Sequence, residues 1–264
     1  MRSTVGLGLG VGLGLAVVDV GADGVGVAGV TGWQAANTRV ASTQEPVANT
    51  REGGMSVRLA RRRNRGHTGP VIDLTADAVD LAPRLLGCLL HAGEVVLRLT
   101  EVEAYSGSGD LAAHAAIGPR PRTAALFAGP GVLYCYLSHG IHVCGNIVCG
   151  RPDHGSAVLL RAGEVVGGLE PARRRRPGVP DAALARGPGN LGRVMGWTLA
   201  DSGRRLGEDG PRLEPGEPPS GIASGPRVGV SVAHERPWRF WIPGDPSVSA
   251  YRRSPRAVAD HRAW

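Results

Sequence analysis

Short apolar runs separated by turn residues recur from about residue 70, and their spacing predicts β-strands joined by tight turns. The run Val95–Leu99 is apolar and rich in valine, so it predicts a strand, which we extend to Ala104. Cys88–His91 predicts the partner of this strand. Gly93-Glu94 lies between the two runs and suits the turn of a hairpin.

A second hairpin is predicted farther along the chain. Residues 132–137 and 141–149 form its strands, and Ser138-His139-Gly140 form its tip. Alternation places Tyr134 and Tyr136 on one face of the first of these strands. The other predicted elements are helices at 80–86 and 191–195, a helical turn at 110–116, strands at 157–161, 226–230 and 238–242, and a surface loop at 203–221.

The continuation of the first predicted strand carries unusual polar residues. At a period of two, Glu101, Glu103 and Tyr105 project from the same face. Burying two carboxylates and a phenol costs several kcal/mol unless they are paired, protonated or used chemically. Neighbouring carboxylates also raise the pKa of one of the pair, which suits acid–base chemistry. The alternative interpretation is a solvated edge of the sheet.

Two further residues are candidates for the same site. Arg161 follows the apolar run 157–160, so its strand is expected to bury it. A buried guanidinium requires an anionic partner, either a carboxylate or a phosphate. The turn at 110–116 sets His114 opposite the carboxylates, although a histidine in such a place is more often structural than active.

The first 69 residues differ from the rest of the chain. Residues 1–38 are rich in glycine and carry few charges, and their apolar run is too short to span a membrane. We expect residues 1–69 to be a disordered leader and basic arm, or sequence upstream of a start at Met55. One domain is expected at 70–251, followed by a polar tail at 252–264.

The basic residues are all arginine. The sequence has 30 of them, no lysine and a net charge of +7. Residues 1–54 hold three arginines and four acidic residues, a net charge of −1, so the remainder carries +8. This charge favours a polyanionic partner, nucleic acid before a membrane surface, unless it only reflects an arginine-rich proteome. Without lysine, no side chain can form a Schiff base.

The four cysteines show no disulfide spacing, so reduced thiols in the cytoplasm are expected. One metal-binding interpretation remains open in the second hairpin, where His139, His142, Cys144 and Cys149 lie close in sequence. Because these residues lie on both of the alternating faces of a strand, their four side chains would not converge on one metal ion. We expect no metal and no cofactor.

Several motifs occur together in one order across residues 71–250. The chain resembles the alkyladenine (3-methyladenine) DNA glycosylases of the mammalian type and their bacterial relatives. The matching segments are Leu85-Leu86-Gly87, Glu101-Val102-Glu103-Ala104-Tyr105, Asp110-Leu111-Ala112-Ala113-His114, Gly131-Val132-Leu133-Tyr134-Cys135-Tyr136, Asn146-Ile147, Val158-Leu159-Leu160-Arg161, Gly187-Pro188-Gly189-Asn190-Leu191, Pro226-Arg227-Val228-Gly229-Val230, Pro237-Trp238-Arg239-Phe240 and Pro243-Gly244-Asp245-Pro246.

The resemblance implies a single α+β domain. Its core is a curved antiparallel β-sheet with short helices around it, and a protruding β-hairpin inserts into the minor groove of DNA. The implied activity is base-excision repair by a monomeric cytoplasmic enzyme, associated with the bacterial nucleoid and not with a membrane. Its partner is double-stranded DNA containing damaged purines, and it removes alkylated purines of the 3-methyladenine class.

The resemblance also implies roles for seven residues. Glu103 is the general base that activates water, and Arg161 lies beside it. Tyr105, His114 and Tyr136 form the pocket for the base, and Asn146 discriminates against the amino group of guanine. His139 is the wedge that inserts into DNA. His139 departs from the tyrosine usual in the family, which puts the efficiency of base flipping in question. Asn190 is a milder departure, because many relatives have lysine there.

The residues themselves agree with this chemistry. An alkylated purine is cationic, and cations bind well against the faces of tyrosine rings. Because there is no lysine, we predict a monofunctional enzyme that leaves an intact abasic site. Two alternatives remain: a module that binds nucleic acid without catalysis, which would release no base, and a metalloenzyme built on the second hairpin, which would contain zinc.

Overall fold

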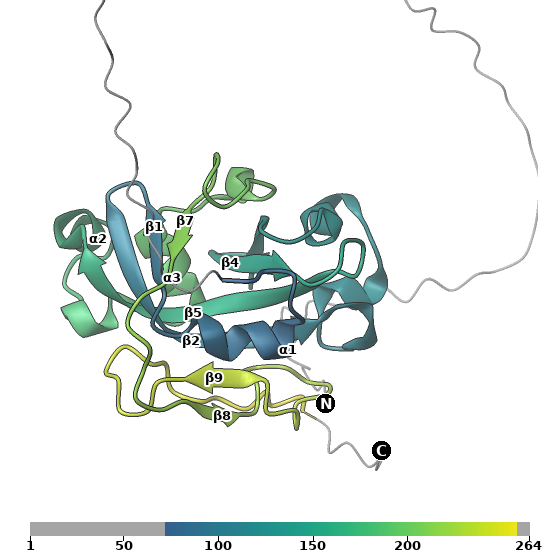
Figure 1. Cartoon of the computed structure of the whole chain (residues 1–264). Coiled ribbons are helices and arrows are strands. Elements are labelled where there is room, and N and C mark those ends of the chain that lie inside the picture. The colour runs from purple at the N-terminus through teal and green to yellow at the C-terminus, as the bar shows by residue number, and fades with distance from the viewer. Residues whose placement is uncertain (1–71, 258–264) are drawn as a thin grey trace, which may run out of the picture. The chain divides into compact units, whose positions relative to one another are not determined.

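The computed structural model of this protein describes residues 72–257. The expectations for the leader and basic arm therefore lie outside the described residues, as does the end of the polar tail. Within the described residues the fold is α+β, with one curled antiparallel sheet and a few short helices (Figure 1). This confirms the fold class.

The described sheet has nine strands. Six of them follow the order β3-β4-β5-β2-β1-β7, while β6 pairs with β5, and β9 pairs with both β2 and β8. The strands are β1 (Leu89–Ala92), β2 (Val95–Ser106), β3 (Leu133–Ser138), β4 (His142–Cys149), β5 (Ser156–Gly167), β6 (Ala185–Arg186), β7 (Arg212–Glu214), β8 (Ala223–Gly225) and β9 (Arg239–Trp241).

The helices are short. The α-helices are α1 (Ala78–Leu81), α2 (Leu169–Arg175) and α3 (Pro188–Met195). Six 3₁₀ segments accompany them: Ala82–Leu85, Gly107–Gly109, His114–Ile117, Pro121–Phe127, Asp181–Ala183 and Leu199–Asp201. Helix α1 lies along the long strands β2 and β5, and α3 packs against β4 and β5 (Figure 1).

Both predicted hairpins form. β1 and β2 pair around a turn in which Gly93 has φ +57°, and β3 pairs with β4 so that Tyr136 lies opposite Cys144. At the second tip, His139 and Gly140 have φ values of +51° and +72°. That this hairpin enters DNA stays a prediction.

An irregularity in β2 separates the core from the polar face. Leu97 and Leu99 belong to the main apolar core, but the pairing with β5 shifts on both sides of Glu101. After this bulge the core residues are Val102 and Ala104. An extra residue in one strand reverses the parity of the faces, so Glu101 and the odd-numbered residues that follow turn away from the core.

Two predicted elements were wrong, and one helix has different bounds. The surface loop predicted at 203–221 is interrupted by β7, which pairs with β1. Residues 226–230 are not a strand: β8 ends at Gly225, and the following segment bends so that its polar groups reach side chains of β2 and the loop after it. The helix predicted at 80–86 begins instead at Ala78 and continues to Leu85 as a 3₁₀ segment. Proline lacks a backbone N–H, which explains why Pro83 lies in the first turn of that segment.

Candidate active site

A cavity of about 1920 Å³ opens on the face of the sheet away from the main core. All seven residues predicted for the site line it: Glu103, Tyr105, His114, Tyr136, His139, Asn146 and Arg161. Its volume exceeds the roughly 300–1,000 Å³ of ordinary small-molecule pockets. The cavity therefore extends past a pocket for one base, as far as the tip of the β3–β4 hairpin.

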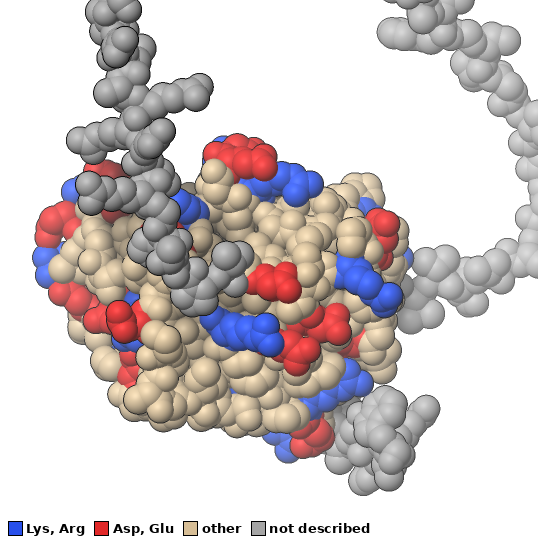
Figure 2. All heavy atoms as spheres, viewed as in Figure 1, with Lys and Arg blue, Asp and Glu red and all other residues tan. Residues whose placement is uncertain are grey.

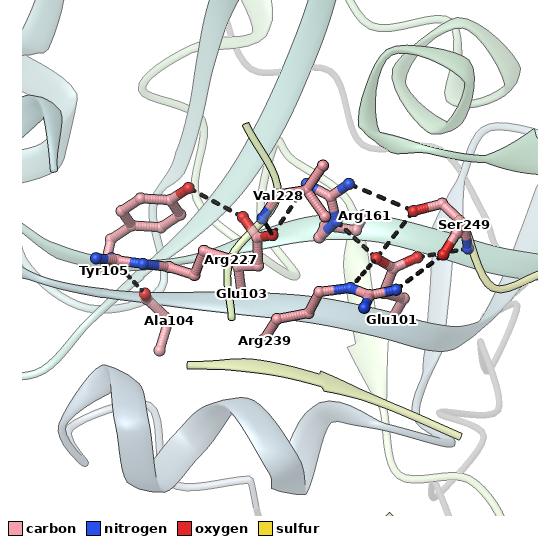
Figure 3. Close-up of polar contacts among 9 residues, drawn as sticks. All are labelled: Glu101, Glu103, Ala104, Tyr105, Arg161, Arg227, Val228, Arg239 and Ser249. Carbon is pink, nitrogen blue, oxygen red and sulfur yellow. Dashed lines mark hydrogen bonds and ion pairs between the residues drawn. The ribbon is translucent and has the colours of Figure 1, made fainter. Parts of the chain in front are cut away.

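Glu103 is fully buried in β2 and receives three donors (Figure 3). Arg161 Nη1 lies 3.1 Å from Oε1, the backbone N–H of Val228 donates to Oε1 at 2.7 Å, and the Tyr105 hydroxyl donates to Oε2 at 2.9 Å. A carboxylate offers about four lone-pair sites. The two hydrogen bonds leave acceptor capacity for a further donor such as water, on a residue that lines the cavity.

Glu101 is equally buried but does not line the cavity. Its carboxylate accepts from Arg161 Nε and Arg239 Nε, each at 2.7 Å, and from the backbone N–H and hydroxyl of Ser249 at 2.7 and 2.9 Å (Figure 3). Burial alone raises the pKa of Glu101, but the two guanidinium groups outweigh it and hold the pKa below its ordinary value. The raised pKa expected from a neighbouring carboxylate is therefore not found at Glu101.

Arg161 joins the two carboxylates. It projects from β5, is itself buried, and contacts Glu101 and Glu103 through different nitrogens. Burial opposes its charge, but the two carboxylates raise its pKa above the ordinary value for arginine. The expectation that a buried Arg161 needs an anionic partner is confirmed, and the partners are carboxylates.

Three aromatic rings lie side by side in the cavity. Tyr134 and Tyr136 are stacked with ring centroids 5.9 Å apart, and the His114 ring meets Tyr136 edge-on at 4.6 Å. His114 Nδ1 is 3.0 Å from the Tyr134 hydroxyl. Burial and the charge of Arg122 lower the pKa of His114, so its imidazole is neutral at pH 7. Tyr134 was not among the predicted pocket residues, although its alternation with Tyr136 was the signal for it.

Tyr105 completes the pocket from β2. The Arg227 guanidinium covers one side of its ring, with Cζ 4.7 Å from the ring centroid. Arg227 forms a buried ion pair with Asp110, which comes 117 residues earlier in the chain. Sequence reasoning missed this pair and the Val228 amide, because no local pattern connects residues so far apart.

The two remaining predicted residues lie on the second hairpin. The side-chain amide of Asn146 is buried and donates to the Tyr134 carbonyl at 3.1 Å. His139 is exposed at the tip, with Nδ1 3.0 Å from the Ser138 hydroxyl. The structure thus brings Asn146 to the rings and leaves His139 at the outer end of the cavity.

The charge of the cavity differs from that of the surface. On the face shown in Figure 2, acidic and basic side chains are interspersed. By contrast, the cavity lining includes a single carboxylate, that of Glu103, among the residues the structure describes. Its arginines are Arg122, Arg161, Arg252, Arg253 and Arg256. A cavity of this charge suits a polyanionic ligand.

The cysteine and histidine residues of the second hairpin do not form a metal site. Between residues 72 and 257, no three His, Cys, Asp or Glu side chains are arranged to hold a metal ion. His142 is exposed, whereas Cys144 and Cys149 are buried. Burial raises the pKa of Cys149 to about 12, which keeps its thiol protonated near neutral pH.

Comparisons with known proteins agree with the geometry. The sequence pattern of the methylpurine-DNA glycosylase family matches residues 73–246. A protein of Nocardia farcinica is 51% identical over 197 residues, which cover 71% of this chain and 93% of the relative. A protein of Cutibacterium acnes is 47% identical over 190 residues, which cover 69% of this chain and 100% of the relative. A protein of Mycolicibacterium paratuberculosis is 52% identical over 194 residues, which cover 70% of this chain and 94% of the relative. All three carry 3-methyladenine DNA glycosylase in their names.

Proposed function

We propose a substrate class and a mechanism on one premise: this chain belongs to the methylpurine-DNA glycosylase family. It is therefore a DNA glycosylase of base-excision repair, and its substrate is DNA. The lesions we propose are purines alkylated at N3 or N7, in double-stranded DNA. The observation that carries this proposal is the buried Glu103 carboxylate, which lines a cavity beside three aromatic rings.

The damaged base first leaves the duplex. Rotating a nucleotide out of the stack costs a few kcal/mol, which a side chain inserted into the vacated space offsets. His139 is the inserted side chain in this proposal. Its exposed place at the hairpin tip supports this, as do the flanking Leu137 and Ile141, whose exposed fractions are 46% and 71%.

The extruded base then enters the ring-lined part of the cavity. Alkylation at N3 or N7 makes the purine cationic, and such a ring gains from contact with the tyrosines and with neutral His114. A normal base lacks this gain. Asn146 lines the same cavity. In this proposal its side chain disfavours the extra amino group of guanine.

Glu103 supplies the chemistry. Its carboxylate accepts a proton from a water that attacks the anomeric carbon of the sugar, while the purine leaves with the electrons of the glycosidic bond. The developing oxocarbenium ion is stabilised by negative charge close by, as in glycosidases. Arg161 is a positioning residue, because it holds the carboxylate in place at 3.1 Å.

The reaction stops at the abasic site. Enzymes that also cut the backbone do so through an amine adduct with the sugar, and the sequence contains no lysine to form one. We therefore propose a monofunctional enzyme. In this proposal it acts as a monomer, and it works at the bacterial nucleoid because its relatives are bacterial and its substrate is DNA. Among the described residues, none of the helices has the length and apolar character needed to cross a membrane.

The direct test is base release from defined duplexes. Purified protein is incubated with duplexes containing 3-methyladenine or hypoxanthine, and both free base and strand breaks are measured. We expect release of 3-methyladenine and strand breaks only after alkali or heat. Binding without release would indicate a module that only recognises DNA, and nicking without alkali would contradict the monofunctional mechanism.

A further inference from the structure

A buried ion pair lies directly behind one ring of the pocket. Arg227 and Asp110 are both fully buried, and Arg227 Nη2 donates to Asp110 Oδ1 at 2.9 Å, with a second contact between Nη1 and Oδ2. The guanidinium lies over Tyr105 at 4.7 Å from the ring centroid and over Trp238 at 5.1 Å. The mechanism above uses neither charged group.

The ring of Tyr105 contacts both this pair and the cavity. Tyr105 lines the cavity, whereas Arg227 and Asp110 do not. A base stacked on the open face of the ring, about 3.5 Å away, would lie roughly 8 Å from the guanidinium on the other face. A cationic base and Arg227 would then share one aromatic ring from opposite sides.

Two cations on one ring oppose each other. At an effective dielectric constant of about 20, unit charges roughly 8 Å apart change an equilibrium by about ten- to thirtyfold. That repulsion acts on a cationic base and not on a neutral one. Asp110 offsets it, because its carboxylate pairs with the guanidinium and does not itself line the cavity.

We infer that Asp110 is a specificity-determining residue: it neutralises the Arg227 charge behind Tyr105 and so lets the pocket prefer cationic purines over neutral ones. The inference rests on the proposed function and adds to it the residue that sets the charge preference.

The pair also holds local structure. Asp110 accepts from the backbone N–H groups of Ala112 and Ser106, and Arg227 donates to the carbonyls of Ala104 and Ala233. A loss of activity on mutation would therefore not distinguish charge from folding. The test must compare two ligands of the same shape that differ in charge.

The experiment measures the affinity of the full-length protein for two such duplexes. One contains 3-methyladenine on a 2′-fluorinated sugar, which slows base loss, and the other contains the neutral isostere 3-methyl-3-deazaadenine. The readout is the ratio of the dissociation constant for the neutral lesion to that for the cationic lesion. Thermal unfolding checks that each variant is folded.

The two single variants are expected to move this ratio in opposite directions. Asp110→Asn leaves the guanidinium uncompensated and lowers the ratio about ten- to thirtyfold. Arg227→Gln leaves the carboxylate uncompensated and raises it. The double variant restores a ratio within a few-fold of the wild type. Asp245→Asn is the matched control, because Asp245 pairs with Arg98 away from the cavity and its loss leaves the ratio unchanged.

Other outcomes overturn the inference. If both single variants weaken the two lesions equally, the pair has only a structural role. If one single variant does not fold, the direction in which the other variant shifts the ratio still tests the inference. Asp110→Glu keeps the charge and must therefore keep the wild-type ratio. If the wild type binds neither lesion better than undamaged DNA, the proposed function itself fails, and that result is distinct from an unchanged ratio.

Discussion

Glu101 and Glu103 lie two residues apart on one face of β2, are equally buried and share Arg161, yet their surroundings differ. Glu101 accepts four hydrogen bonds and does not line the cavity. Glu103 accepts two hydrogen bonds, forms an ion pair with Arg161 and lines the cavity. Burial of a carboxylate therefore does not identify a catalytic group here. What separates the two carboxylates is that only Glu103 lines the cavity, and this is why we propose it as the catalytic group.

The donors of the two carboxylates explain the division. Glu101 ties β2 to β5, to β9 and to the segment around Ser249, so it joins parts of the chain that are distant in sequence. Glu103 is held by residues of the site itself. We interpret Glu101 as a structural anchor that fixes Arg161, and Glu103 as the group that Arg161 positions for chemistry.

The largest effect is expected when the shared residue is removed. Arg161→Gln leaves two buried carboxylates without their common partner, so we expect a loss of about 5 kcal/mol of unfolding free energy and no detectable base release. Denaturant unfolding and single-turnover release measure the two. Arg173→Gln is the control, because that arginine pairs on the surface. Unchanged stability in Arg161→Gln would contradict the shared role.

Removing the anchor alone should mainly lower stability. Glu101→Gln breaks a buried ion pair with Arg161 and Arg239, and we expect a loss of about 3 kcal/mol. At a temperature where the variant is folded, the release rate should fall far less than in a Glu103 variant. Loss of base release in folded Glu101→Gln protein would contradict the different roles given to Glu101 and Glu103.

A smaller effect is expected from the hydroxyl that joins the pocket to the carboxylate. Tyr105→Phe removes one donor to Glu103 but keeps the ring, so we expect base release about tenfold slower, the equivalent of about 1.4 kcal/mol. Single-turnover release measures it, and Tyr251→Phe on the surface is the control. A rate equal to the wild type would mean that this hydrogen bond does not position Glu103.

The pH dependence of stability gives the finest distinction. The pKa of Glu101 is lower in the folded state than its ordinary value of 4.5, so the unfolded chain binds more protons and stability rises with pH between the two values. The contribution is complete above about pH 4.5 and is lost as the pH falls through the folded pKa. The stability difference between wild type and Glu101→Gln should therefore shrink below pH 4.5 in denaturant titrations. A constant difference would contradict the lowered pKa.

Much of the site was accessible from the sequence. A period of two along one strand placed Glu101, Glu103 and Tyr105 on a common face, and the structure confirms that they lie together. The buried Arg161 was expected to need an anion. The family resemblance then identified Glu103 rather than Glu101 as the candidate general base. The alternating pattern alone does not distinguish the two.

The rest depends on contacts that no local pattern contains. The bulge at Glu101 is what separates the polar face from the core, because strict alternation continues the Leu97 and Leu99 face through Glu101. Residues 226–230 look like a strand by composition, but the buried pair of Arg227 with Asp110 and the Val228 contact to Glu103 pull this segment out of the sheet. Packing and charge pairing between residues distant in sequence determine these features.

The central claim is that Glu103 performs the chemistry while the surrounding cavity only binds. Glu103→Gln keeps the shape of the side chain and removes its capacity to take a proton. The most direct measurement is single-turnover release of 3-methyladenine, together with the affinity for the same duplex carrying the 2′-fluorinated sugar. We expect release to fall about 10²–10⁴-fold, with binding within a few-fold of wild type. Release near the wild-type rate in the folded variant would contradict the account.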